Sequence, residues 1–298
     1  MGHHHAEDAT APLPFVSHMI AGAMAGTMEH IAMYPVDTIK TRMQALSHPG
    51  QRLHGVSVYN AINTAIRREG LRGLYKGVGA VAAGAGPAHA LQFAVYEAVK
   101  DVAGGNQAGH SSFISGASGA IATAFNDAIM TPVDVTKQRL QVVHSPYRGV
   151  LHCVTQVYKQ EGLRAFFKSY RTTLVMNIPF ITMHFTVYDA AKRLITGSED
   201  ADDETFTVQL LAGGMAGGAA AAVTTPFDVV KTRLQTEGVH SAKRYHGSAV
   251  IPTMRRIIAE EGWKALWHGA QPRVLFHAPS AAVCWGTYET MKTLLLDR

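Results

Sequence analysis

The feature that most constrains the fold of this chain is a ten-residue string that occurs three times. The string starts with proline and carries an aspartate, a lysine, an arginine and a glutamine at fixed positions, and its copies are residues 35–44, 132–141 and 226–235. Two shorter motifs recur in step with it, a Glu-Gly pair at Glu69, Glu161 and Glu261 and a tyrosine-acid-x-x-lysine string that ends at Lys100, Lys192 and Lys292. Self-similarity at a nearly fixed interval indicates one structural unit used three times.

Each unit contains two long, largely apolar stretches around a polar and basic link. The first stretches are residues 15–44, 113–141 and 206–235, and the second are about residues 78–100, 170–192 and 270–292. A helix needs about 20 largely apolar residues to cross a membrane, and we expect all six stretches to do so. The sequence therefore predicts an all-α membrane protein. Its six transmembrane helices form three tandem helix-pair repeats that close into a pseudo-threefold barrel, with short helices on the link side.

The repeats also predict the domain organisation. We expect residues 1–14 to be a flexible N-terminus and not a secretory signal, because this segment is polar and lacks an apolar core. Repeat 1 then covers residues 15–100, repeat 2 covers 111–192 and repeat 3 covers 206–298. Together they are expected to form one domain over residues 15–298.

Composition, charge and the absence of catalytic motifs argue against two broad classes of function, nucleic-acid binding and catalysis. Charged residues make up 16% of the chain, against about 25% in typical soluble domains. The net charge is +5, but the basic residues occur one or two at a time, so we expect an anionic membrane surface and no nucleic acid as partner. The sequence has no His-Glu-x-x-His, phosphate-binding loop or Cys-x-x-Cys motif, so it is not expected to be an enzyme.

The aspartates and lysines of the ten-residue string lie on stretches that should cross lipid, where an unpaired charge is costly. Within each copy they are three residues apart and share a helix face. In a ring of three repeats each aspartate can reach the lysine of the next repeat. The expected link-side pairs are Asp37 with Lys137, Asp134 with Lys231, and Asp228 with Lys40. The glutamines expected to brace them through hydrogen bonds are Gln44, Gln141 and Gln235.

A second set of charges lies at the opposite ends of the second stretches. The expected pairs there are Glu97 with Lys192, Asp189 with Lys292, and Glu289 with Lys100. Fixing the helix register is the alternative role for such pairs. Partly buried ion pairs add little net stability over apolar residues, so two rings at opposite ends favour two gates that open alternately around a central cavity.

The threefold Pro-x-Asp-x-x-Lys-x-Arg-x-Gln string and the Glu-Gly links resemble the mitochondrial carrier family along essentially the whole chain. The resemblance implies a multi-pass protein of the mitochondrial inner membrane, with the link-side ring as the matrix gate and the other ring as the cytoplasmic gate. It implies that Tyr96, Tyr188 and Tyr288 brace the cytoplasmic gate. Cardiolipin is implied at helix N-termini, where exposed N–H groups favour phosphate. One threefold barrel needs no partner, so we expect a functional monomer.

The residues around Pro87, Pro179 and Pro279 should line the cavity between the gates. The positions aligned on these prolines carry no arginine or lysine, which a carrier of nucleotides or dicarboxylates would need. They carry histidine, methionine and asparagine instead, and imidazole and thioether suit transition metals. His30, His89 and Met176 are the expected transient metal ligands, with no permanently bound cofactor. Ordinary helix packing is the alternative role for any single histidine.

The strings at residues 28–30, 86–90 and 176–180 resemble the iron-carrying branch of the same family. That resemblance implies ferrous iron as the substrate, imported into the matrix for haem and iron–sulfur cluster synthesis. The substrate contacts that it implies are Gly84, Ala85, Met176, Asn177, His277 and Ala278. A carrier for a small organic cation or zwitterion such as S-adenosylmethionine stays open as an alternative, because Asp127 and Asn177 could bind such a ligand. A non-transporting scaffold or a proton leak is a further alternative.

Overall fold

The computed structural model describes residues 15–45, 58–103, 112–143, 145–196, 206–238, 245 and 249–296. Within these residues it contains nine α-helices, two short 3-10 helices and no strand. The long helices are α1 (Phe15–Gln44), α3 (Val78–Val102), α4 (Ser112–Gln141), α6 (Tyr170–Thr196), α7 (Phe206–Thr236) and α9 (Ala270–Leu296). The shorter ones are α2 (Val58–Leu74), α5 (Val150–Glu161), α8 (Val250–Glu261), η1 (Leu163–Phe167) and η2 (Trp263–Trp267). The all-α class is confirmed, and the N-terminal segment predicted to be flexible lies outside the described residues.

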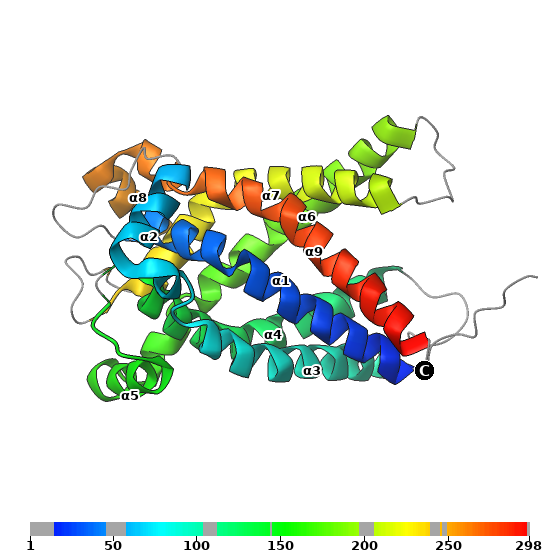
Figure 1. The fold of residues 1–298 in the computed structure, drawn as a ribbon, viewed down its shortest axis with the longest axis horizontal. Helices are drawn as coiled ribbons and strands as arrows, with labels where there is room; N and C mark the ends of the chain where they lie inside the picture. Colours follow the sequence, from blue (N-terminus) through cyan, green and yellow to red (C-terminus); the bar gives the residue numbers. More distant parts are fainter. Residues whose placement is uncertain are drawn as a thin grey trace, which may run out of the picture.

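Each repeat contributes two long helices with a short helix between them. The short helices α2, α5 and α8 lie at one end of the molecule, and the described C-terminal end of α9 lies at the other (Figure 1). Helix α5 ends at Glu161 and α8 ends at Glu261, so each stops at its Glu-Gly pair. Helix α2 is broken at the equivalent place, because Gly70 has φ 70° and ψ 179°. We call the end that carries these helices the link end.

Two of the described helices are long and apolar enough to cross a membrane by length and composition, at Val78–Val102 and Thr207–Thr236. The other four predicted spans do not meet this criterion over their described residues. The other four long helices carry charged residues within their length, among them Glu29, Asp127, Arg171 and Arg273. Composition alone cannot separate such a helix from a soluble one, because a charge that is paired inside a bundle counts in the same way as a charge exposed to water.

Contacts between the six long helices connect them in a ring. Helices α1 and α9, α3 and α4, and α6 and α7 pack extensively against each other, and so do α7 and α9. The two other pairs within a repeat, α1 with α3 and α4 with α6, are in sparse contact. The third repeat therefore packs its two long helices together more closely than the first and second repeats do.

Three small hydrophobic clusters fix the short helices at the link end. In each cluster apolar residues near the C-terminus of α1, α4 or α7 pack against the short helix of the same repeat. Cys153 and Val157 of α5 show why, since residues four apart on an amphipathic helix share one face, and both are fully buried. Burial also raises the pKa of the Cys153 thiol to about 12, so this thiol stays protonated at neutral pH.

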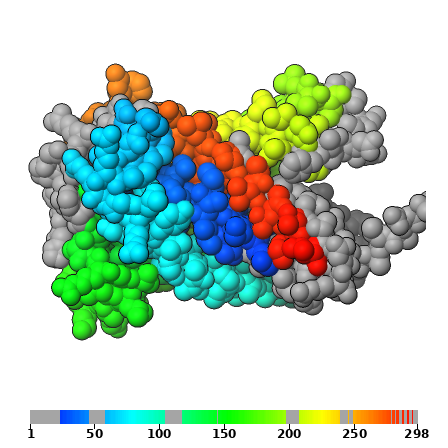
Figure 2. Space-filling model, in the orientation of Figure 1, coloured from blue at the N-terminus to red at the C-terminus, as the bar shows by residue number. Residues whose placement is uncertain are grey.

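The long helices diverge at the end opposite the link end. Figure 1 shows the α6–α7 pair separated there from α1, α3 and α9. In Figure 2 the surface is hollowed between the yellow α7 and the orange and red α9 at that end. The described helices are therefore drawn together at the link end and spread apart at the other.

Candidate functional site

Three ion pairs join the long helices at the link end. The lysine Nζ atoms lie 2.7 Å from Asp37 Oδ2 (Lys137), 3.0 Å from Asp134 Oδ2 (Lys231) and 3.0 Å from Asp228 Oδ2 (Lys40). Each pair joins an aspartate of one repeat to the lysine of the next, which is the pairing that the spacing predicts. We call the three pairs the link-side ring, and we name each corner of the ring by its aspartate.

The glutamines at the end of the ten-residue strings brace two of the three corners. Gln141 Nε2 donates to Asp37 Oδ2 at 3.1 Å, and Gln44 Nε2 donates to Asp228 Oδ2 at 2.8 Å. Gln235 is fully buried as well, but its side-chain amide makes no hydrogen bond to any residue that the structure describes. The expectation that Gln235 braces the Asp134 corner was therefore wrong.

One residue in the second repeat explains the missing brace. Thr41 Oγ1 donates to Gln141 Oε1 at 3.0 Å, and Thr232 Oγ1 donates to Gln44 Oε1 at 2.9 Å. These hydroxyls orient the two bracing glutamines. The second repeat has Gln138 at the position of these threonines, and Gln138 Oε1 is itself buried without a partner in the described part of the chain. A longer side chain without a hydroxyl thus leaves Gln235 unoriented.

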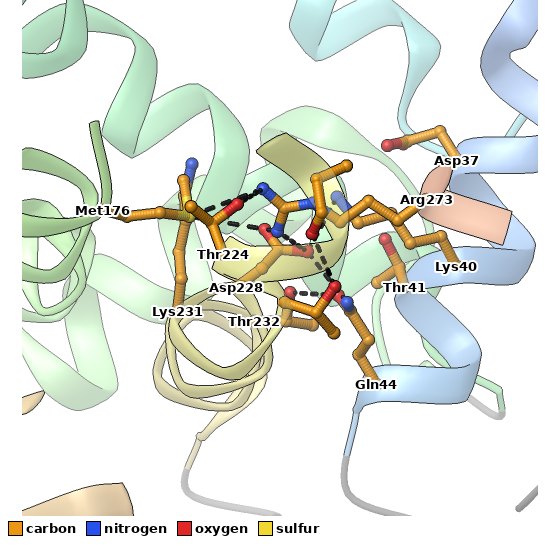
Figure 3. A network of polar contacts seen from close by, with 12 residues as sticks. Asp37, Lys40, Thr41, Gln44, Met176, Thr224, Asp228, Lys231, Thr232 and Arg273 are labelled. Carbon is orange, nitrogen blue, oxygen red and sulfur yellow. Dashed lines mark hydrogen bonds and ion pairs between the residues drawn. The ribbon is translucent and has the colours of Figure 1, made fainter. Parts of the chain in front are cut away.

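The Asp228 corner contains a second cation that sequence reasoning missed. Arg273 of α9 lies with Nη1 2.8 Å from Asp228 Oδ2, and its Nη2 donates to Thr224 Oγ1 at 2.8 Å. The same guanidinium reaches Met176 of α6, with Nη2 3.8 Å from the sulfur. Figure 3 shows Arg273 between Met176 and Asp228. Arg273 lies outside the proline-aligned positions compared above. Those positions carry no arginine, but an arginine nevertheless lies beside Met176.

The arginine of the ten-residue string makes the same two contacts in all three repeats. Its Nε donates to the backbone carbonyl of the glutamine that ends the next string, at 2.9 Å for Arg42, 3.0 Å for Arg139 and 3.3 Å for Arg233. Its guanidinium also pairs with the glutamate of its own Glu-Gly motif, and the partners are Glu69, Glu161 and Glu261. These charge-assisted contacts tie each long helix to its own link and to the next repeat.

Glu69 shows the electrostatics of these link contacts. Burial opposes ionisation of its carboxyl, but the hydrogen bond from Lys76 and the nearby charge of Arg42 outweigh burial and keep the pKa of Glu69 below its ordinary value. Lys76 Nζ lies 2.8 Å from Glu69 Oε2. The equivalent lysine of the second repeat, Lys168, pairs with Glu237 of the third repeat at 2.6 Å instead.

The second predicted ring is not formed between the described residues. Glu97 is exposed and makes no ion pair with Lys192, and Lys100 Nζ lies 5.8 Å from the centre of the Tyr96 ring on its own helix. The spread of α3 from α6 at this end explains why the Glu97–Lys192 pair is open (Figure 1). Tyr188 stacks on His184, and Asp189 is exposed. The side chains of Tyr288, Glu289 and Lys292 lie outside the described residues.

The predicted substrate contacts on α6 are already engaged with protein partners. Met176 is buried and contacts Arg273, and Asn177 Nδ2 donates to Asp127 Oδ2 of α4 at 2.7 Å. The adjacent Met176 and Asn177 therefore face a guanidinium on one side and a carboxylate on the other. Nothing in the sequence motifs singled out this opposition of charges.

The other predicted contacts lie in helix packing. Gly84 faces Val133 of α4 so closely that a side chain there would collide with it, which explains a glycine at this α3–α4 contact. His277 lies with its ring centre 5.9 Å from that of Phe180 and packs against Gly217 of α7. Ala85 is half-buried, and the side chain of Ala278 lies outside the described residues.

His30 lies on α1 and His89 on α3, two helices in sparse contact. His30 is half-buried on α1 and His89 is exposed on α3. Neighbouring Glu29 accepts a short hydrogen bond from Ser280 of α9. Among the described residues no group of three or more histidine, cysteine or acidic side chains could hold a metal ion. Met176, the third predicted metal ligand, contacts Arg273.

Comparisons with known proteins agree along nearly the whole chain. A family profile described as mitochondrial carrier protein matches residues 11–107, 109–199 and 202–298. A mitoferrin of Dictyostelium discoideum is 39% identical over 99% of this chain and 98% of its own length. A mitoferrin of Caenorhabditis briggsae is 41% identical over 97% of this chain and 96% of its own length. Mitoferrin-1 of Homo sapiens is 40% identical over 95% of this chain and 84% of its own length.

Proposed function

This chain belongs to the mitochondrial carrier family and is similar to its mitoferrins, and on that premise we propose that it carries ferrous iron across the mitochondrial inner membrane. The family is one of transporters and not of enzymes, and its members are proteins of mitochondrial membranes. The observation that carries the proposal is the near full-length similarity to mitoferrins of three distant organisms. The direction that we propose is import into the matrix, for haem and iron–sulfur cluster synthesis.

We propose that the six long helices cross the membrane as a pseudo-threefold barrel. Support comes from contacts that recur in all three repeats, namely the aspartate–lysine pairs and the arginine contacts at the link end. Charges on the long helices that lack an apolar composition are tolerable in lipid if they face the interior and pair, as the ring residues do.

The link-side ring then serves as the matrix gate, and the described conformation has this gate closed. The ring's ion pairs are formed, whereas on the opposite ring Glu97 is exposed and makes no ion pair with Lys192, and the helices diverge there (Figure 1). We propose that Glu97, Lys100, Asp189, Lys192, Glu289 and Lys292, with Tyr96, Tyr188 and Tyr288, close the cytoplasmic gate in the other state. A working carrier opens one gate at a time. Release of the substrate through the matrix gate therefore requires the link-side pairs to break.

Iron is the transported substrate in this account, held by few ligands at a time. His30 and His89 supply imidazole donors that suit divalent iron, and Met176 adds a softer, weaker thioether donor. A site with one or two protein ligands releases its ion readily, in contrast to a closed structural site with four. The arrangement of the described residues favours passage over storage, because the histidines and Met176 are not gathered into one cluster.

A carrier for a small organic cation or zwitterion is the second candidate, and one observation favours it. Asp127 and Arg273 lie on either side of Met176 and Asn177. A zwitterion such as S-adenosylmethionine could place an ammonium group near the carboxylate and a carboxylate near the guanidinium.

We also propose that cardiolipin binds at helix N-termini around the link end and that the carrier works as a monomer. Helices α5 and α8 begin without a side-chain cap. Their first N–H groups, which have no intrahelical partner in any helix, therefore lack a side-chain acceptor as well and favour a phosphate. All three corners of the link-side ring are completed within one chain.

The test is Fe2+ uptake into cardiolipin-containing proteoliposomes under reducing conditions. We expect saturable uptake by the wild type and its collapse in a His30→Ala, His89→Ala double variant. His152→Ala, a histidine on the link helix α5, is the matched control and should retain uptake. No Fe2+ uptake above that of empty liposomes, together with exchange of S-adenosylmethionine, would support the second candidate and refute the first.

A further inference from the structure

The Asp228 corner holds more positive charge than the carboxylate can balance. Asp228 Oδ2 lies 3.0 Å from Lys40 Nζ and 2.8 Å from Arg273 Nη1. The Asp37 and Asp134 corners each pair one aspartate with one lysine. The link-side ring together with Arg273 therefore has three acids and four cations. Asp228 therefore shares its single charge between two cations, and one of them, Arg273, contacts Met176, while Asp127 supplies a fourth carboxylate on the Asn177 side.

The structure holds this extra charge in a fixed place. Arg273 is 6% exposed, and Thr224, Asp228 and Met176 surround its guanidinium. Its Nη1 and Nη2 lie 4.0 Å and 3.8 Å from the Met176 sulfur. A guanidinium cannot lose its proton in a protein, so the charge cannot be relieved by titration. The equivalent positions of the other repeats are Val81 and Thr173, so the charge lies on one side of the ring.

A guanidinium in this position opposes metal binding in two ways. Its N–H groups point at the thioether sulfur of Met176. The lone pairs of that sulfur are the ones that would bind a metal ion. A divalent cation bound to that sulfur would also lie within a few ångströms of a like charge in a poorly solvated site, where repulsion is much stronger than in water. Every metal ion that reaches Met176 must therefore displace these contacts and remain under repulsion.

We infer that Arg273 sets the affinity of the substrate site, keeping divalent cations weakly bound at Met176 so that they are released through the link-side gate. The inference rests on the proposed function, since it assigns the role for a cation substrate. Arg273 is a positioning and specificity-determining residue in this account and not a ligand. Tight binding in the middle of a carrier would trap the substrate, so a repulsive charge at the floor of the site raises the rate of release.

The main test compares Fe2+ uptake kinetics of the wild type and Arg273→Gln. Glutamine keeps a hydrogen-bond donor near Thr224 and removes the charge. We expect KM to fall by about tenfold or more, because the repulsion is lost, and the maximal rate to fall because release is slower. Arg273→Lys should keep a KM near that of the wild type. A KM that is unchanged or raised in a folded Arg273→Gln protein would overturn the inference.

Gln44→Leu is the matched control for damage to the gate. It removes another contact of Asp228 and leaves the contact between Arg273 and Met176 in place, so its KM should stay near the wild-type value even if its maximal rate changes. A fall in KM equal to that of Arg273→Gln would contradict a specific role for the arginine. In a Met176→Leu background, Arg273→Gln should no longer lower KM, as a double-mutant cycle requires for coupled residues.

Mn2+ binding to the purified protein, measured by the paramagnetic resonance signal of the free ion, separates this inference from the proposed function. Tighter binding by Arg273→Gln than by the wild type supports the inference whether or not Fe2+ is transported. Equal binding, or none by either protein, overturns it. If Arg273→Gln does not fold, Thr224→Val retains every charge and frees the guanidinium to move from the sulfur. It should then lower KM in the same direction, and an unchanged KM would count against the inference.

Discussion

The Asp228 and Asp134 corners of the link-side ring come from the same ten-residue string, yet they differ in how firmly they are held. Asp228 has Lys40, Gln44 and Arg273 within hydrogen-bond distance. Asp134 has Lys231, at 3.0 Å, and its bracing glutamine, Gln235, makes no side-chain hydrogen bond within the described part of the chain. The string therefore fixes the ion pairs, and residues outside its shared positions decide the strength of each corner.

The Asp37 corner lies between these two. Its aspartate accepts a hydrogen bond from Gln141, and Lys137 Nζ lies 5.4 Å from the centre of the Tyr34 ring. The difference between corners indicates that a threefold gate need not open symmetrically. We expect the Asp134 corner to separate first, because fewer contacts must be broken there.

The largest expected effect comes from two single variants, one without the aspartate of the Asp228 corner and one without the aspartate of the Asp134 corner. Asp228→Asn leaves Lys40 and Arg273 without their carboxylate, and breaking a buried pair in this way costs about 3–5 kcal/mol. Asp134→Asn leaves one lysine, Lys231, which still interacts with Asp127, and should cost about 1–3 kcal/mol. Thermal unfolding of both variants in one detergent checks the order. Equal losses, or a larger loss at Asp134, would show that the corners do not differ.

A smaller effect is expected from the two glutamines. Gln44→Leu leaves Thr232 and Asp228 each short of a hydrogen bond and should destabilise the fold by about 1–3 kcal/mol. Gln235→Leu removes a buried amide that has no partner in the described structure, so it should be neutral or stabilising. The same unfolding measurement compares them. A destabilising Gln235→Leu would mean that the Asp134 corner is braced after all.

The smallest expected effect comes from a substitution that should supply the missing hydrogen bond at the Asp134 corner. Gln138→Thr restores the hydroxyl that orients the glutamine at the other corners and should stabilise the protein by about 0.5–1.5 kcal/mol. It should also slow Fe2+ uptake, because the corner that opens first becomes harder to open. Gln138→Val has nearly the same shape without the hydroxyl and is the control. Threonine and valine variants with the same unfolding temperature and uptake rate would count against this explanation.

The helices and the link-side pairs could be predicted because they depend on features shared by all three repeats. Helix α1 has the predicted bounds, and α4 begins one residue before its predicted start. Helices α3, α6 and α9 run beyond the lysines at which the predicted stretches ended, to Val102, Thr196 and Leu296. A lysine does not stop a helix, so those ends could not be placed from the motif.

What the sequence did not reveal lies where the repeats differ or where the protein changes state. Arg273 has no counterpart in the other repeats, and comparing equivalent positions finds what is shared. Gln138 was visible as the one glutamine among threonines, but its effect depends on hydrogen bonds that only the structure shows. The open Glu97–Lys192 pair reflects the conformation described, and a carrier's sequence must be compatible with more than one.

The most direct test of this account is a charge exchange at the Asp134 corner, read out as Fe2+ uptake into proteoliposomes. Asp134→Lys and Lys231→Asp each place like charges at a corner that must close, and each should abolish uptake. Combining them restores an ion pair of opposite orientation, and the account predicts that uptake returns. If both single variants transport as the wild type does, or if a folded double variant stays as inactive as the single ones, the link-side ring is not the gate of this carrier.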